Sequence, residues 1–322
     1  MLDGAYLSVD TARSSDMEDS GPFEARYLSF LETITNLRPA LHRYCSRMIG
    51  SVLDGEDVVQ NALFQAFRKL DTYRDSLPLK PWLFRIAHNC CIDFLRRREV
   101  RREAEAEVAA DDVVPPADPA GPVVGRAVEH LVLALPPMER ACVLLKDVFD
   151  YSIEETSELV ESSTGGVKAA LHRGRGKLAS LSLGVAAPQE ANPALRRLLD
   201  LYVERFNDRD WDGLRDLISA DARLRVADRF DGRLSESPYF GRYAQTMQPW
   251  LLAVGEVDGE AAIIAMERIG HGWRPGSAIR LDVVGGRIVR IVDYKHCPWI
   301  LPAAATVHVS HGAGEPYLGM RG

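Results

Sequence analysis

The hydrophobic periodicity of this chain changes once along its length, and that change limits the folds open to it. From Phe23 to about Leu183 apolar residues recur at helical spacing, whereas the later segments alternate apolar and polar residues, as half-buried strands do. A chain of 322 residues is also too long for a single ordinary core. The sequence therefore predicts a multi-domain protein, with helical modules followed by an α+β domain.

Two stretches rich in proline, alanine and acidic residues interrupt the pattern, VAADDVVPPADPAGP (108–122) and GVAAPQEANP (184–193). They predict a division into a disordered acidic arm 1–22, a helical domain 23–102, a linker 103–122, a second helical domain 123–183, a linker 184–192, an α+β domain 193–302 and a tail 303–322.

The last domain contains two predicted helices, at 195–206 and 211–218. Alternating runs bounded by Asp258-Gly259, Gly272 and Gly285-Gly286 predict strands at 222–228, 250–257, 261–269, 277–284 and 287–294. Helices packed on a curved antiparallel sheet are the expected architecture.

The net charge of −7 argues against a general nucleic-acid binder, but the charge is unevenly distributed. Residues 26–102 hold 14 Lys or Arg against 8 Asp or Glu, a local charge of 14 − 8 = +6. Acidic residues gather instead in the N-terminal arm and between Glu103 and Asp118. This asymmetry indicates an anionic partner for the first helical domain.

Composition excludes several other classes. No apolar run approaches the ~18 residues that a membrane helix needs, and the acidic N-terminus does not resemble a secretory signal, so a cytoplasmic location without membrane contact is expected. The five cysteines form no metal-ligand spacing, and His88 beside Cys90 and Cys91 does not make one. Buried reduced thiols, no metal and no cofactor are expected.

Two amphipathic segments lie in the first helical domain. In EDVVQNALFQAFRKL one helical face carries Val59, Ala62, Leu63, Ala66, Phe67 and Leu70. In PWLFRIAHNCCIDFLRRRE, Pro81 suits the first turn of a helix that ends in a cluster of arginines. Its apolar stripe consists of Trp82, Leu83, Ile86, Cys90 and Phe94. Periodicity alone indicates only an amphipathic helix with a basic end.

The segments EDVVQNALFQAF and LKPWLFRIAHNCCIDFLRRR, in this order, resemble region two of extracytoplasmic-function sigma factors over about residues 26–102. The resemblance implies that the first helix docks on the largest subunit of RNA polymerase core, through Asp57, Gln60, Asn61 and Phe64. It also implies that the second helix and the preceding loop read and open the minus-ten promoter element. The DNA-contact candidates there are Tyr73, Asn89, Asp93, Arg96 and Arg97.

A second signal lies in ALPPMERACVLLKDVFDYSIEETSELVESSTGGVKAALHRGRGKL. Ser152 and Glu155 predict a capping box, a turn follows near Glu161, and a basic helix begins after Ser163. This is a helix-turn-helix pattern. The string resembles region four of the same family, in which Glu161 stands where a turn glycine is common. The implied minus-35 contacts are Thr164, Lys168, His172, Arg173 and Arg175.

The segment LLDLYVERFNDRDWDGLRDLISADARLRV and the strands after it resemble SnoaL-like members of the nuclear-transport-factor-like cone fold, over about 193–302. Some members of that fold are enzymes and others bind ligands or regulate. Polar residues that could line a pocket are Asp228, His271, Asp282, Tyr294 and His296. A surface or structural role is the stronger expectation for each of them.

The leading hypothesis is a promoter-specificity subunit that binds polymerase core and promoter DNA and catalyses nothing. Its last domain would regulate it through a small-molecule ligand or an intramolecular contact. Two alternatives are a SnoaL-like enzyme with a regulatory helical part, and a helix-turn-helix regulator that acts without polymerase docking. The segment LKPWLFRIAHNCCIDFLRRR favours the first hypothesis, because neither alternative needs it.

Overall fold

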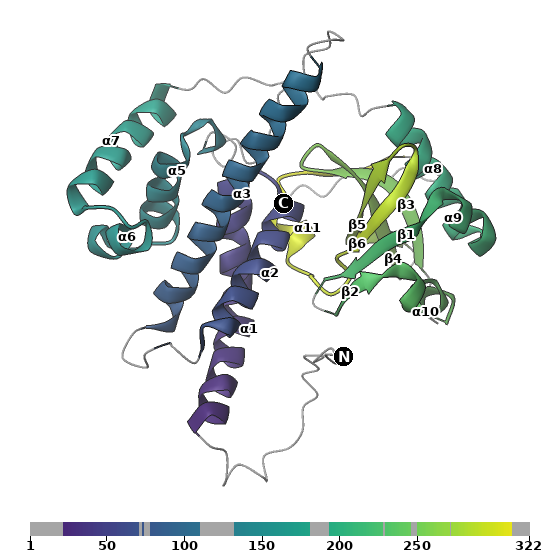
Figure 1. Cartoon of the computed structure of the whole chain (residues 1–322), viewed down its shortest axis with the longest axis horizontal. Coiled ribbons are helices and arrows are strands. Elements are labelled where there is room, and N and C mark those ends of the chain that lie inside the picture. Colours follow the sequence, from purple (N-terminus) through teal and green to yellow (C-terminus); the bar gives the residue numbers. More distant parts are fainter. Residues whose placement is uncertain are drawn as a thin grey trace. The chain divides into compact units, whose positions relative to one another are not determined.

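A computed structural model describes residues 22–70, 73, 78–109, 132–180, 193–227, 229–245, 250–270 and 272–310. The described residues divide into a helical unit, within residues 12–186, and a C-terminal unit, within residues 187–322 (Figure 1). In the described part of the chain, no helix combines the length and the apolar character required to cross a membrane.

The first module of the helical unit is a three-helix bundle of α1 (Pro22–Ile49), α2 (Val52–Arg68) and α3 (Leu79–Ala109). Ser51 begins α2 by accepting a hydrogen bond from the backbone N–H of Asp54 at 3.1 Å. Helices α1 and α2 approach so closely that a Cβ at Gly55 would lie 2.8 Å from backbone atoms of Ser46. The bundle packing therefore requires glycine at this position.

The second module contains the helix-turn-helix that the sequence predicts. It consists of η2 (Val132–Ala134), α5 (Pro137–Val143), η3 (Leu144–Val148), α6 (Ile153–Leu159) and α7 (Thr164–Ser180). The capping box of Ser152 and Glu155 is present, with hydrogen bonds of 3.0 and 2.7 Å. The Ser163 hydroxyl accepts from the Gly166 N–H at 3.0 Å and so caps α7. The turn between the two helices passes through Glu161.

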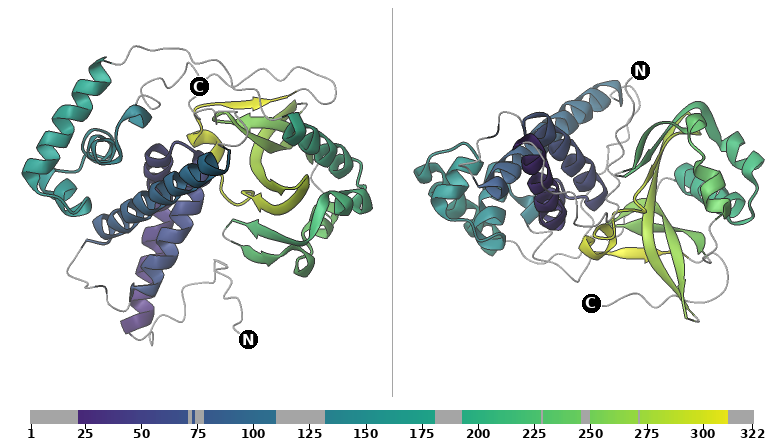
Figure 2. Two further views of the ribbon diagram at one scale, coloured as in Figure 1. Left: turned by 45° about the horizontal axis from the view of Figure 1, so that its top comes forward. Right: turned by 90° about the horizontal axis from the view of Figure 1, so that it is seen from below.

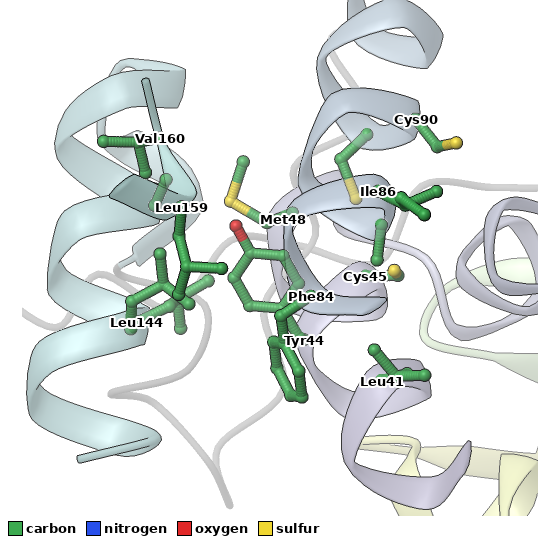
Figure 3. Close-up of a cluster of buried hydrophobic side chains, with 14 of the residues drawn as sticks. Leu41, Tyr44, Cys45, Met48, Phe84, Ile86, Cys90, Leu144, Leu159 and Val160 are labelled. Atoms are coloured by element: carbon green, nitrogen blue, oxygen red, sulfur yellow. The ribbon is translucent and has the colours of Figure 1, made fainter. Parts of the chain in front are cut away.

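The two modules share one apolar core (Figure 3). The rings of Tyr44 and Phe84 in the first module pack against those of Phe149 and Tyr151, which lie just before α6 in the second module. The centroid distances are 5.4–5.8 Å. The buried guanidinium of Arg140 bridges the modules by donating to the carbonyl oxygens of Met48 and, at 3.0 Å, Leu135. Both apolar and polar contacts therefore hold the two modules together.

The C-terminal unit places helices on a curved seven-stranded sheet (Figure 2). The strand order is β2-β1-β6-β5-β4-β3-β7, and every neighbouring pair except β1–β6 is antiparallel. The strands are β1 (Ile218–Val226), β2 (Phe230–Arg233), β3 (Trp250–Val257), β4 (Glu260–Ile269), β5 (Gly272–Val284), β6 (Arg287–Asp293) and β7 (Val307–Val309). The helical elements are α8 (Pro193–Asn207), α9 (Trp211–Leu217), η4 (Leu234–Glu236), α10 (Tyr239–Gln245) and α11 (Ile300–Ala303). The predicted α+β architecture is confirmed.

The FNDRDW segment has a structural role at the junction of α8, α9 and β3. The Asn207 side chain exchanges two hydrogen bonds of 2.8 Å with the backbone of Leu252. The Arg209 guanidinium lies 3.8 Å from the Trp250 ring centroid, and Asp210 caps α9 through the Gly213 N–H. These contacts fix the helices on the sheet.

Several boundaries differ from the sequence predictions. Helix α3 continues to Ala109, into the segment expected to be a linker, and β1 begins four residues early. Strands β2 and β7 and helix α10 were not anticipated; β7 pairs with β3 inside the segment expected to be a tail. The turn expected at Gly272 contains Gly270, at φ 60°. The acidic arm before Pro22, linker residues 110–122 and the linker 184–192 lie outside the described residues.

Candidate functional site

Helix α2 presents a small exposed patch of Asn61, Phe64 and Phe67. Phe64 is 60% exposed and Phe67, expected in the core, is 48% exposed and packs edge-on against Tyr27. Two other candidates are less accessible: Asp57 is half-buried, and Gln60 is half-buried and donates to Glu56 at 3.3 Å. Exposed aromatic rings of this kind indicate a protein contact surface.

Helix α3 presents the polar face that the sequence predicts. Its exposed members are Asn89, Asp93, Arg96 and Arg97. The Tyr73 ring packs against the Trp82 ring at a centroid distance of 4.8 Å. This contact holds the tyrosine near the start of the helix. The opposite side of α3 is buried and includes His88, whose Nδ1 is 2.9 Å from the Tyr44 hydroxyl. Burial lowers the pKa of His88 to about 4, so this histidine is a neutral structural residue at physiological pH.

The turn of the helix-turn-helix lies against this polar face. The Glu161 carboxylate accepts from Arg85 Nε at 3.0 Å and forms an ion pair with Arg85 Nη2 at 2.9 Å. It also accepts from the Asn89 amide at 3.5 Å. These donors, Arg85 first, lower the pKa of Glu161. One of the predicted minus-ten contacts, Asn89, therefore already has an intramolecular partner.

The predicted minus-35 residues lie on the exposed face of α7, and two of them are ion-paired within their own module. Arg175 binds Asp147 through two nitrogens, the longer contact being 3.0 Å. Arg173 and Lys177 both contact Glu139 at 2.9 Å and lower its pKa. Thr164, Lys168 and His172 are exposed on the same helix. The arginines are thus held in position by carboxylates of their own module.

The described members of the predicted pocket set lie on β5 and just after β6 in the C-terminal unit. Asp282 lies 3.8 Å from Arg280 and from Arg290 on strands β5 and β6. Tyr294 is buried, whereas His296 is exposed. Asp228 and His271 lie outside the described residues. A shared pocket for Asp282, Tyr294 and His296 stays a prediction.

Asp293 is a buried carboxylate of this unit, and the sequence analysis did not include it among the candidate site residues. It is 1% exposed and its Oδ2 accepts from the hydroxyls of Tyr239 at 3.0 Å and Tyr243 at 2.7 Å. Its Oδ1 accepts from the Lys295 N–H at 2.8 Å. Burial raises the pKa of Asp293 despite these donors. Within the described residues, no group of three or more His, Cys, Asp or Glu could hold a metal ion.

Comparison with known proteins assigns the helical unit. Residues 33–101 match the family described as Sigma-70 region 2, and residues 125–178 match Sigma-70, region 4. The ECF RNA polymerase sigma factor SigM of Mycobacterium tuberculosis is 34% identical over 142 residues, which cover 44% of this chain and 70% of SigM. The chain belongs to the ECF family of RNA polymerase sigma factors. This confirms the predicted family and its two sigma modules.

The similarity of this sigma factor to its relatives extends beyond the two modules. The ECF RNA polymerase sigma factor SigG of Mycobacterium tuberculosis is 30% identical over 250 residues, which cover 69% of this chain and 66% of SigG. That share of the chain exceeds the helical unit, so part of the C-terminal unit is included. The solved structure of SigJ from Mycobacterium tuberculosis is 16% identical, covers 82% of this chain and 95% of SigJ, and has a TM-score of 0.34.

Proposed function

We propose that this sigma factor binds RNA polymerase core through α2, directs it to promoters with α3 and α7, and assists DNA opening. The observation that carries the proposal is the exposed polar face of α3, opposite an apolar face that is buried or half-buried. Arg96 and Arg97 suit phosphate contacts, and Asn89 and Asp93 suit contacts to base edges. Tyr73 supplies a ring on which an unpaired base can stack. Transcription from a promoter library with purified core polymerase tests the proposal.

Replacing Phe64 with alanine is expected to weaken binding to core polymerase by about tenfold, since a central aromatic side chain at an interface commonly contributes 1–2 kcal/mol. The fold should be unaffected, because Phe64 is 60% exposed. Titration of labelled protein with core polymerase measures the change. Val100→Ala on α3 is the matched control, because Val100 is equally exposed and lies outside the patch. Equal affinities for Phe64→Ala and the control would exclude this docking surface.

We further propose that the C-terminal unit regulates the sigma factor and catalyses nothing. Asp293 is its most enclosed carboxylate, and both of its oxygens already accept hydrogen bonds from the protein. A carboxylate held in this way supports the fold and is not positioned to take a proton from a substrate.

Truncation after Leu183 is expected to change promoter-dependent transcription several-fold while leaving core binding intact. The reason is that a short linker keeps the C-terminal unit at high effective concentration near the sigma modules. Run-off transcription and core titration of the full and truncated chains measure the two properties. Identical transcription across salt and temperature would mean that the C-terminal unit has no regulatory role.

A further inference from the structure

Glu161 combines an unfavourable backbone with a specific set of side-chain contacts. Its φ of 53° lies in the left-handed region, which glycine adopts freely and glutamate rarely does. Residues held in that region cost of order 1–3 kcal/mol and persist where other interactions compensate. A glycine would complete the same turn without strain. The presence of glutamate instead of glycine therefore indicates that the side chain of Glu161 has a role beyond turn formation.

That side chain reaches out of its own module to α3. Arg85 and Asn89 lie more than 70 positions earlier in the sequence, and the carboxylate engages both. Both members of the ion pair are about half exposed, 52% for Arg85 and 53% for Glu161. Water and salt therefore reach the contact, which makes it reversible. Around it the aromatic contacts of Tyr44 and Phe84 hold the same two modules together.

This closed arrangement is incompatible with simultaneous use of both promoter elements. The minus-ten and minus-35 elements are named for positions about 25 base pairs apart, which is roughly 85 Å at the 3.4 Å rise of B-form DNA. In the closed unit, Glu161 is only three residues before Thr164, the first residue of α7, and is within hydrogen-bond distance of α3. The modules must separate before α3 and α7 can occupy their two elements.

We propose that Glu161 is an intramolecular latch that closes the helical unit by binding Arg85 and by occupying Asn89, a proposed minus-ten contact, in place of promoter DNA. This inference rests on the proposed promoter-binding function, which it extends to regulation. The latch is a carboxylate that competes with the base edges of DNA for Asn89, and its ion pair with Arg85 adds to the closure. When the unit opens, DNA replaces the Glu161 carboxylate as the anionic partner of α3. Elevated salt therefore weakens both the latch and DNA binding.

The test compares Glu161→Gln and Glu161→Gly with Glu158→Gln in the full chain. Glu158 is an exposed residue of α6 and provides the same charge change on the same motif. A fluorophore pair on Glu99 of α3 and Ala179 of α7 reports the distance between the modules without DNA or polymerase. Both Glu161 variants should shift the distance distribution towards separation, and Glu158→Gln should not. The rate of promoter-complex formation with core polymerase should rise about two- to five-fold, the range expected for an exposed ion pair.

Glu161→Gly separates a latch from a merely structural residue. Glycine relieves the left-handed backbone, so the thermal stability of the chain should be maintained or increased while the modules separate more often. Unchanged distances in both Glu161 variants would overturn the latch, as would separated modules with unchanged promoter-complex formation. If no variant, wild type included, binds core or promoter, the proposed function fails, and the distance measurement still decides whether the modules are latched.

Discussion

Replacing Glu56 with alanine is expected to lower the free energy of unfolding of the helical unit by about 3–5 kcal/mol, the usual result of removing one partner of a buried ion pair. Glu56 is fully buried and pairs with the almost buried guanidinium of Arg38. Without the carboxylate, the enclosed guanidinium of Arg38 loses its buried ion-pair partner. Chemical denaturation followed by circular dichroism measures the loss. The Glu56→Ala substitution should also weaken binding to polymerase core, because Glu56 accepts a hydrogen bond from Gln60 on α2.

The double variant Arg38→Met with Glu56→Leu should recover most of this loss, because apolar residues of similar volume often replace a buried pair without penalty. Glu99→Ala removes an exposed pair with Arg102 on α3 and should cost less than about 1 kcal/mol. A Glu56→Ala protein as stable as the Glu99→Ala protein would show that the Arg38–Glu56 pair contributes little to the fold.

Replacing Lys168, Arg173 and Arg175 together with alanine is expected to weaken binding to minus-35 DNA by about tenfold or more. If all three contact phosphates, the slope of log affinity against log salt should become shallower by about 2.7, since each contact contributes about 0.9. Binding titrations of the holoenzyme at several salt concentrations measure both quantities. The same variant should bind core polymerase normally, because these residues lie on α7 rather than on α2.

Asp147→Asn is the informative companion variant. It frees Arg175 from a two-nitrogen contact with a carboxylate without removing the arginine. DNA affinity should then rise modestly and the salt dependence should stay the same or steepen. A triple variant with the wild-type salt dependence would contradict the assignment of α7 to DNA, and reduced binding by Asp147→Asn would show that the ion pair serves to present Arg175.

Helix α3 shows what periodicity can and cannot predict. The apolar stripe from Trp82 to Phe94 and the exposed polar face were both predicted correctly. The structure also buries Phe84, Ala87, His88 and Cys91, which the stripe did not include. His88 bonds Tyr44 of α1, whereas Phe84 packs against Phe149 and Tyr151 of the second module as well as against Tyr44. A periodic pattern that assumes one buried face cannot anticipate a helix packed on two sides.

The C-terminal unit was predicted at the level of architecture, but the buried contacts of Asp293 were not anticipated. Regular alternation along β5 and β6 would place residues of one parity on each face, but the register shifts between Asp282 and Val283. The predicted pocket set included Tyr294, whereas its neighbour Asp293 accepts hydrogen bonds from Tyr239 and Tyr243 on α10. That helix was not predicted, so the sequence offered no partner for the carboxylate.

The five buried thiols make this chain a natural set of accessibility reporters. Cys45, Cys90 and Cys91 lie in the first module, Cys142 in the second and Cys297 in the C-terminal unit, and none forms a disulfide. Burial raises the pKa of Cys90 and of Cys142 to about 11, so the thiolate that alkylating reagents require is scarce in the folded protein. Alkylation at each position, read by mass spectrometry, would follow the transient opening of each part of the molecule separately, with no engineered label.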